Sequence, residues 1–249
     1  MLEIHSLCCF AGKKKILDGI DFSLTPNTLT AVVGRNGCGK STLVSCINRT
    51  RDYTGEILFS GKDLALMPPR ERAQLIAVLP QLLKSSHIKV HELISFGRNP
   101  YIDLGHHLTD RDVTAIKEAA EDTGVSDLLW RYTDELSGGE RQKAYLAMIL
   151  AQDTKLIVLD EPTTYMDMTY AQEFMTLLCN LKSRHRKTLL VVMHDLNQAV
   201  RFSDSIIVME NASMVFCGRT KDCLECNIIE STFGVVRHKA DGRIFFSAD

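Results

Sequence analysis

The chain has 249 residues, of which 45% are hydrophobic and 24% are charged, and its formal net charge is −2. This ordinary globular composition suits one large domain or two small ones, and its charge provides no overall basic field for nucleic acid. No apolar stretch approaches the ~18–20 residues that a membrane-spanning helix needs. Residues 2–6 begin in a strand-like alternation, without the apolar core of a signal peptide. We therefore expect a cytoplasmic protein that binds no nucleic acid.

Short strand-like runs alternate with helical stretches along most of the chain. The runs cover residues 20–24, 29–33, 56–59, 76–79, 156–159, 189–193 and 206–209. A helix is predicted over residues 41–48, and a mostly helical pattern extends over residues 90–152. This order predicts an α/β fold interrupted by a helical insert. The early strands are expected to be antiparallel and the later ones parallel, because helices separate only the later ones.

The eight cysteines raise the question of a disulfide framework or a metal site. Disulfides are rare in proteins without a secretory signal. Cys223 and Cys226 form a single C-x-x-C pair, whereas a structural zinc site needs four ligands. We interpret these two as small buried side chains on a C-terminal helix. The strand-like setting of Cys8 and Cys9 also indicates burial.

A phosphate-binding loop is predicted at residues 34–41, which fit G-x-x-x-x-G-K-S between an apolar strand and a helix. The glycines let the backbone N–H groups point at phosphate oxygens. Lys40 reaches the β- and γ-phosphates, and the Ser41 hydroxyl can bind Mg²⁺. The alternative is an ordinary glycine-rich turn. The candidate nucleotide-binding residues are Gly34, Asn36, Gly37, Cys38, Gly39, Lys40, Ser41 and Thr42. As a further hypothesis, thiol reagents modify Cys38 and block ATP binding.

Two carboxylates follow the apolar run 156–159, which has the pattern of a buried parallel strand. The carboxyl end of such a strand is where α/β sheets bind ligands. Asp160 can hold Mg²⁺ there, directly or through water. Glu161 can accept a proton from an attacking water molecule. The alternative is an acidic pair that begins a solvated turn.

A second anion-binding feature lies at residues 135–142, which read Glu-Leu-Ser-Gly-Gly-Glu-Arg-Gln. Ser137 and Glu140 fit the capping box that begins a helix. A helix N-terminus beside glycines attracts anions. The chain therefore carries two candidate phosphate sites where one nucleotide needs one.

These motifs resemble those of the nucleotide-binding subunits of ABC transporters, and the resemblance covers nearly the whole chain. The sequence Leu-Ser-Gly-Gly-Glu at 136–140 is similar to the signature sequence of that family. Gln81 matches the Q-loop, Asp167 the D-loop and His194 the switch histidine, all in family order.

The resemblance implies one ABC ATPase domain over residues 1–249 with a P-loop NTPase fold. A RecA-like core with an N-terminal antiparallel β subdomain would comprise residues 1–81 and 154–249. The helical subdomain that carries the signature sequence would comprise residues 82–153.

The resemblance also implies ATP and Mg²⁺ as cofactors, and a catalytic set of Lys40, Gln81, Glu161 and His194. Gln81 would contact Mg²⁺ and the attacking water, alongside Ser41 and Asp160 as metal-binding residues. His194 would contact the γ-phosphate, although a lone histidine after a strand is more often structural.

The signature residues Ser137, Gly138, Gly139 and Glu140 would bind the ATP held by Lys40 of a second copy. The active unit is then expected to be a head-to-tail dimer with two-fold symmetry. Asp167 would lie at the interface between copies, or simply cap the helix that begins near residue 169. Phe10 stands near the place where the family usually has an adenine-stacking tyrosine, and a core role is the alternative.

The stretches 97–101 and 195–199 are similar to those of ATPases that serve importers of ferric siderophores, haem and cobalamin. The expected function is therefore the ATP-hydrolysing subunit of an importer, with iron chelates favoured as cargo. Its partners would be transmembrane permease subunits, docked in a groove formed by residues 82–108, and indirectly a substrate-binding protein. The location would be the cytoplasmic face of the cell membrane. The alternatives are a soluble ABC ATPase of iron–sulfur cluster assembly and a module that uses nucleotide only as a clamp.

Overall fold

The computed structural model describes residues 1–83, 86–103, 107–164, 166–240 and 243–248. The chain divides into two compact units, which comprise residues 1–67 with 188–249, and residues 68–187. Among the described residues, none of the helices combines the length and the apolar character needed to cross a bilayer.

An antiparallel sheet forms the N-terminal part of the first unit. Its strands, in spatial order, are β2 (Lys14–Ser23), β1 (Leu2–Ala11), β4 (Thr54–Phe59) and β5 (Lys62–Asp63). Alternate residues of β1, such as Leu2 and Ile4, are fully buried, as a strand with one covered face requires. The prediction that the early strands are antiparallel is confirmed for the runs at 20–24 and 56–59, which belong to this sheet. It was wrong for the runs at 29–33 and 76–79, which pair in parallel with strands from later in the chain.

A second sheet supplies the parallel core of the same unit. Strand β3 (Leu29–Gly34) lies between β8 (Thr188–Val192) and β9 (Ser205–Glu210) and is parallel to both. Every residue of β3 and β8 is buried, which explains their unbroken apolar sequence. The next strand, β10 (Ser213–Arg219), was not predicted and is antiparallel to β9. A tight turn at Asn211 and Ala212, both with positive φ, replaces the helical crossover that parallel pairing requires.

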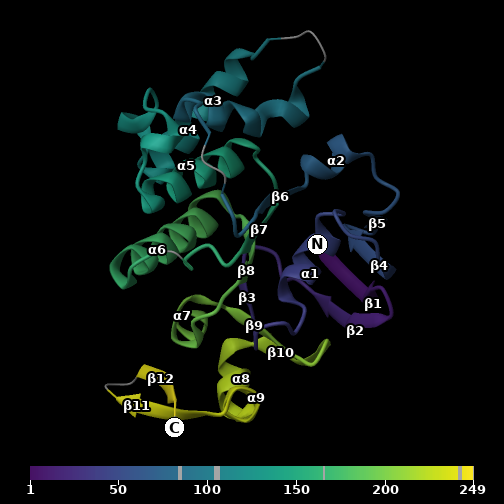
Figure 1. The fold of residues 1–249 in the computed structure, drawn as a ribbon. Coiled ribbons are helices and arrows are strands. Elements are labelled where there is room, and N and C mark those ends of the chain that lie inside the picture. The colour runs from purple at the N-terminus through teal and green to yellow at the C-terminus, as the bar shows by residue number, and fades with distance from the viewer. Residues whose placement is uncertain (84–85, 104–106, 165, 241–242, 249) are drawn as a thin grey trace. The chain divides into compact units, whose positions relative to one another are not determined.

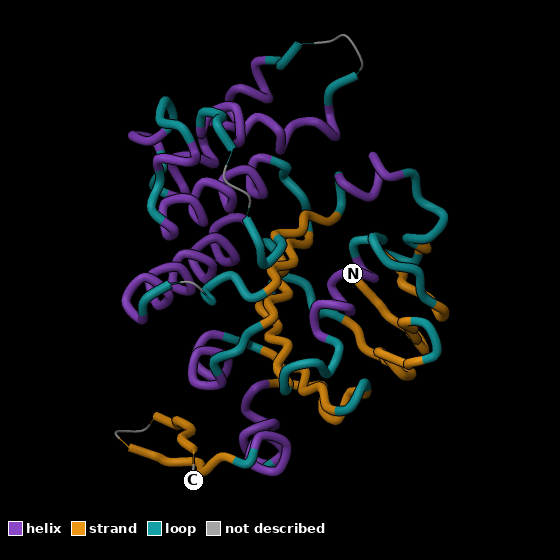
Figure 2. The backbone as a smooth tube through the Cα atoms, in the orientation of Figure 1, coloured by secondary structure: helices purple, strands orange, loops and turns teal. Residues whose placement is uncertain are grey.

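The remaining elements of the first unit are four short helices and a C-terminal hairpin, whose strands are orange in Figure 2. They are α1 (Lys40–Ile47), α7 (Leu196–Phe202), α8 (Thr220–Glu225), α9 (Ile228–Phe233), β11 (Val235–Ala240) and β12 (Arg243–Ala248). Burial of Cys223 on α8 and of Cys9 on β1 is confirmed, whereas Cys8, which was also predicted to be buried, is only half-buried. Burial of Cys226 was predicted wrongly, because α8 ends at Glu225 and leaves Cys226 exposed at its C-cap.

The second unit joins a parallel strand pair to a group of helices, coloured teal to green in Figure 1. Its elements are α2 (Pro69–Ala73), β6 (Ile76–Leu79), α3 (Val90–Ser95), η1 (Phe96–Tyr101), α4 (Asp110–Thr123), η2 (Ser126–Leu128), η3 (Thr133–Glu135), α5 (Gly138–Ala151), β7 (Leu156–Asp160) and α6 (Met168–His185). Helices α3, α4 and α5 share one apolar core. This confirms the helical insert, while the proposed subdomain limits at residues 82 and 153 stay a prediction.

The stretch 97–101 fixes the turn after α3 against the C-terminal end of α5. A side chain at Gly97 would place its Cβ 2.2 Å from the carbonyl oxygen of Met148, so only glycine fits. Arg98 is almost fully buried, and its Nε donates to Asp112 Oδ1 at 2.8 Å while its Nη1 donates to the Ala151 carbonyl oxygen at 2.7 Å. The Tyr101 ring lies 4.0 Å from the Arg98 guanidinium.

The carboxylate of Asp112 has a second role as part of a helix cap. Thr109 is the N-cap of α4, and its hydroxyl and backbone N–H both donate to Asp112 Oδ2. These bonds lower the pKa of Asp112 to about 2. The bond from the Thr109 hydroxyl has the largest effect, followed by those from the Thr109 N–H and from Arg98. The ion pair is therefore charged throughout the ordinary pH range.

Replacing Arg98 tests how much this buried pair contributes. We expect Arg98→Ala to lower the free energy of unfolding by about 3 kcal/mol, because Asp112 is left as a buried charge without its cation. Lys117→Ala is the matched control, since Lys117 forms an exposed pair with Glu121 on α4 at 3.9 Å. That change should cost about 0.5 kcal/mol or less. Urea denaturation measures both, and equal losses in the two variants would contradict the prediction.

Candidate functional site

The phosphate-binding loop lies between β3 and α1, as predicted. The Lys40 side chain is 5% exposed, and its Nζ donates to the carbonyl oxygens of Gly34 at 2.8 Å and Arg35 at 3.3 Å. The ammonium group is thus held under the loop by its own backbone. Of the predicted residues, Gly34, Cys38, Gly39 and Lys40 are buried, Thr42 is half-buried, and Asn36, Gly37 and Ser41 are exposed.

Two glycines give this loop its shape. Gly39 has φ +111°, and a Cβ there would lie 2.7 Å from the carbonyl oxygen of Ile16. Gly37 has φ +78° and no atom within 4 Å of a built Cβ. Gly39 is also the N-cap of α1, where no side chain caps the helix. The uncapped N–H groups and the helix dipole make this end of α1 suitable for phosphate.

The thiol of Cys38 is enclosed within the loop. The side chain is 5% exposed, and burial raises its pKa despite the neighbouring Lys40. Because the thiolate is the reactive form, both properties count against the hypothesis that thiol reagents modify this residue readily.

His194, the predicted switch histidine, shares a sheet edge with the predicted phosphate-binding loop. Strands β3 and β8 pair in register at Val32 and Val192, so Gly34 and His194 each follow two residues beyond a matched pair. The carboxyl ends of parallel strands meet at one edge, where ligands bind. His194 is exposed there, between Met193, whose N–H donates to the Val32 carbonyl, and the start of α7.

Phe10 lies near the end of β1 in the same unit and is 48% exposed. This exposure rules out the alternative of a core position. Lys15 Nζ lies 5.9 Å from the ring centroid, on one face of the ring. A flat exposed ring can stack on a nucleobase, so the adenine contact stays a prediction.

Gln81 and Glu161 are brought together by the parallel pair in the second unit. Strands β6 and β7 pair in register at Leu79 and Leu159, and each of the two side chains follows two residues later. Gln81 Nε2 donates to Glu161 Oε2 at 2.7 Å. Asp160 is the last residue of β7 and is 8% exposed.

The backbone of Glu161 is in the left-handed region, with φ +48°. This conformation is uncommon outside glycine and is found preferentially at functional sites. The Thr164 hydroxyl lies within hydrogen-bond distance of the Glu161 carbonyl oxygen and of its Oε2, 3.1 Å from each. The sequence did not indicate Thr164 as a partner of Glu161, since a Thr-Thr pair after a proline is a common loop sequence.

The capping box at the start of α5 is confirmed. Ser137 Oγ accepts from the Glu140 N–H at 3.3 Å, and Glu140 Oε2 accepts from the Ser137 N–H at 2.9 Å and from its hydroxyl at 2.7 Å. Through these bonds, first of all the one from the hydroxyl, Ser137 lowers the pKa of Glu140. The cap leaves Gly138 and Gly139 as the first two residues of the helix.

A second helix packs against this helix end. A Cβ at Gly139 would lie 3.1 Å from the Tyr170 ring, a contact that the sequence did not indicate. Asp167 is the N-cap of α6, where its Oδ1 accepts from the Tyr170 N–H at 2.9 Å. The capping alternative for Asp167 is thus confirmed, and its role between copies stays a prediction.

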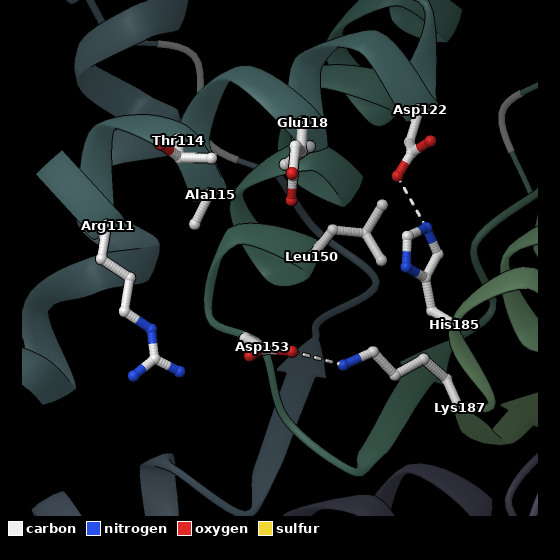
Figure 3. Close-up of a pocket in the computed structure, with 10 residues that line it drawn as sticks. Arg111, Thr114, Ala115, Glu118, Asp122, Leu150, Asp153, His185 and Lys187 are labelled. Carbon is white, nitrogen blue, oxygen red and sulfur yellow. Dashed lines mark hydrogen bonds and ion pairs between the residues drawn. The ribbon is translucent and has the colours of Figure 1, made fainter.

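A separate cavity of about 360 Å³ in the second unit contains none of the predicted site residues. Figure 3 shows its charged side chains on α4, after α5 and at the end of α6. On its walls, Asp122 lies 2.6 Å from Nε2 of His185, and Asp153 forms an ion pair with Lys187 at 2.8 Å. The phosphate-binding residues lie elsewhere in the chain.

A family model described as ABC transporter matches residues 17–164, which is more than half of the chain. The chain belongs to the ABC transporter family. It is 36% identical to the iron(3+)-hydroxamate import ATP-binding protein FhuC of Bacillus subtilis, over 90% of this chain and 84% of that protein. It is 34% identical to the ferric enterobactin transport ATP-binding protein FepC of Escherichia coli, over 90% and 83%.

Solved structures agree on the fold. The ADP-bound conformation of the ATP-binding cassette MJ1267 superimposes with a TM-score of 0.82, covering 94% of this chain and 98% of that one, at 24% identity. The predicted P-loop NTPase fold of an ABC ATPase is thereby confirmed, with the antiparallel sheet, parallel strands and helical insert described above.

Alkylation of the cysteines tests the enclosure of the phosphate-binding loop. We expect iodoacetamide to modify exposed Cys226 at least about ten times faster than Cys38, because burial withholds both access and the thiolate form. Mass spectrometry of peptides after timed exposure measures the two rates within one sample. Comparable rates for the two thiols would show that the loop opens readily in solution.

Proposed function

We propose that this ABC ATPase hydrolyses ATP to drive import of ferric siderophores. The observation that carries the hydrolytic part is the hydrogen bond between Gln81 and Glu161 at the carboxyl ends of β6 and β7. A clamp that only binds nucleotide has no need of a carboxylate held in a left-handed conformation beside an amide. The arrangement therefore favours an enzyme over a binding module.

Phosphate binding falls to the loop between β3 and α1. The N–H groups at the start of α1 donate to phosphate oxygens, and Lys40 exchanges its backbone carbonyl partners for them. Ser41 in the first unit, and Asp160 and Gln81 in the second, each carry a side-chain oxygen of the kind that magnesium prefers as a ligand. Bound Mg²⁺ supplies neutralisation of the charge on the β- and γ-phosphates.

Glu161 is the proposed general base. Its Oε2 accepts hydrogen bonds from the amide of Gln81 and can accept a proton from a water molecule placed beside it. Gln81 orients that carboxylate and offers its own carbonyl oxygen to the water or the metal. His194, which follows β8, is proposed to donate to the γ-phosphate.

The signature residues are proposed to complete the site of a second copy. Ser137, Gly138 and Gly139 would offer a hydroxyl, backbone N–H groups and a positive helix end to the γ-phosphate of the partner. In the single chain the Ser137 hydroxyl donates to Glu140, so it must turn toward the phosphate when the copies meet. Asp167 would face the same interface, and two such half-sites require two-fold symmetry.

The proposed partners are transmembrane permease subunits, and the proposed location is the cytoplasmic face of the cell membrane. Membership of the ABC transporter family supports both. We propose that the permease docks on the region 82–108, within which residues 84–85 and 104–106 lie outside the described part. Within this region Val90, Leu93 and Ile94 pack in the core of the helical insert, so they do not line a groove. Leu82 is 71% exposed and remains available.

The cargo is proposed from the relatives. FhuC and FepC are named for import of iron(3+)-hydroxamate and ferric enterobactin, and a third relative, CbrD of Dickeya dadantii, is named for achromobactin transport at 34% identity over 90% of this chain. Haem and cobalamin are the alternatives within the importer class. A soluble ATPase of iron–sulfur assembly is the alternative outside it, and co-purification with a permease distinguishes the two.

Substitution of the proposed base tests hydrolysis. We expect Glu161→Gln to keep ATP binding and to slow hydrolysis by about 10²–10⁴-fold, because the amide cannot accept the proton. Steady-state phosphate release measures the rate. Glu173→Gln, on the exposed side of α6, is the control and should behave as wild type. Near-normal turnover in the Glu161→Gln protein would end the assignment.

The same variant provides the test of the shared site. With hydrolysis blocked, ATP should convert the Glu161→Gln protein into a dimer, as followed by light scattering. Adding Ser137→Phe should abolish that dimer, because the phenylalanine ring would occupy the space where the γ-phosphate of the partner's ATP binds. Each monomer should still bind one ATP. If the dimer persisted in the double variant, Ser137 would be only a helix cap, with no role in the partner's site.

Transport of labelled cargo tests the substrate class. A strain lacking its iron-chelate, haem and cobalamin importers would receive this chain with its permease and binding protein. We expect uptake of ⁵⁵Fe bound to a hydroxamate or catecholate siderophore, and none with the Glu161→Gln subunit, because transport is driven by hydrolysis. Uptake of cobalamin or haem alone would assign the alternative cargo.

A further inference from the structure

We propose that Asn197 is a positioning residue for His194, acting through a clasp between α7 and the C-terminal hairpin. The proposal rests on the function proposed above, in which His194 contacts the γ-phosphate. All the residues involved belong to the first unit.

The clasp is a pair of reciprocal hydrogen bonds between the side-chain amide of Asn197 and the backbone N–H and C=O groups of Phe246. Asn197 Oδ1 accepts from the N–H of Phe246 at 2.7 Å, and Asn197 Nδ2 donates to the Phe246 carbonyl oxygen at 3.2 Å. The primary amide thus pairs with both backbone groups of one residue of β12, as a neighbouring strand would. Strand β12 lies beside α7 in Figure 1.

The hairpin that receives this clasp is itself well anchored. Phe246 is 6% exposed, so the paired residue is fixed by its own side chain. On β11, Arg237 forms an ion pair with Glu230 of α9 at 3.1 Å and donates to Asn227 Oδ1 at 2.8 Å. It also donates to the carbonyl oxygen of Leu224. Asn197 therefore joins α7 to a support that three other contacts hold.

Helix α7 needs such a support because little of it is buried. Ala199 is its one fully buried residue among Leu196–Phe202. A seven-residue helix with so small an apolar contact is weakly held by packing. Polar contacts at its ends then have a large share in fixing its direction.

The first turn of α7 determines where His194 lies. Asp195 caps the helix, with its Oδ1 accepting from the N–H groups of Asn197 at 2.8 Å and Gln198 at 3.2 Å. On the other side Met193 is bonded to β3. His194 is the single residue between Met193 and the cap residue Asp195, so a shift of α7 moves the imidazole.

The clasp and the phosphate-binding loop are independent of each other. Lys40 and its carbonyl partners belong to the loop after β3, whereas the clasp joins Asn197 of α7 to Phe246 of β12, so the two features share no residue. Loss of the clasp should therefore leave nucleotide binding intact and misplace the histidine that acts on the γ-phosphate. A misplacement of about 1 Å at a reacting group is enough to cost a large part of a rate.

Kinetics of Asn197→Ala provide the first test. The residue is exposed on its other side, so alanine leaves no cavity and suits a helix. We expect kcat for ATP hydrolysis to fall roughly 5- to 20-fold with KM for ATP unchanged. Asn180→Ala, an exposed asparagine on α6, is the control and should leave both constants unchanged.

The nuclear magnetic resonance signal of the His194 ring gives a readout that stability alone would not move. In protein labelled at histidine, this signal is assigned by its loss in the His194→Gln variant. It should shift in Asn197→Ala, while the signals of His5 and His91 stay in place. An unchanged His194 signal together with an unchanged kcat would overturn the proposal.

The two proposals fail in different ways. If His194→Gln retains full turnover, the proposed role of His194 is wrong, and the shift of the ring signal alone then decides whether the clasp positions the residue. If His194→Gln abolishes turnover but Asn197→Ala changes neither the signal nor kcat, the catalytic role stands and the clasp has no part in it.

Discussion

The hydrogen bond between Gln81 and Glu161 depends on the parallel register of β6 and β7. Leu79 pairs with Leu159, and each functional side chain follows two residues after its strand residue. A slip of one residue would turn every side chain of the strand to the other face. The same geometry applies in the first unit, where Gly34 and His194 follow the matched residues Val32 and Val192. The register between buried strands is thus the constraint that brings side chains from distant parts of the sequence next to one another.

Two helix ends are the proposed anion-binding groups, and they differ in how they are capped. The end of α1 has Gly39 at its N-cap and no capping side chain, so its N–H groups are open to a ligand of the same chain. The end of α5 is closed by the reciprocal bonds of Ser137 and Glu140. This closed cap stabilises the helix end in the single chain. The Ser137 hydroxyl can rotate, so the same helix end is still compatible with binding a phosphate held by a second copy.

Some residues that look functional in a sequence serve the fold instead. The stretch 97–101 indicated a class of transporter, and the structure gives it a packing role. Gly97 allows contact with the Met148 carbonyl, and Arg98 neutralises Asp112 within the helical insert. Asn197 belongs to a similar class-indicating stretch, but its side chain joins α7 to the C-terminal hairpin. Motifs that mark a family therefore mix residues that act on the ligand with residues that hold those in place.

The sequence by itself determined the fold class, most strand positions and the phosphate-binding loop, because hydrophobic periodicity and contiguous motifs are local properties. The tertiary structure alone decided that Cys38 is enclosed, that Phe10 is exposed, and that Glu161 is bonded to Gln81. It also revealed the clasp of Asn197 on Phe246. These contacts join residues far apart along the chain, and the register and burial that create them arise only when the strands and helices pack together.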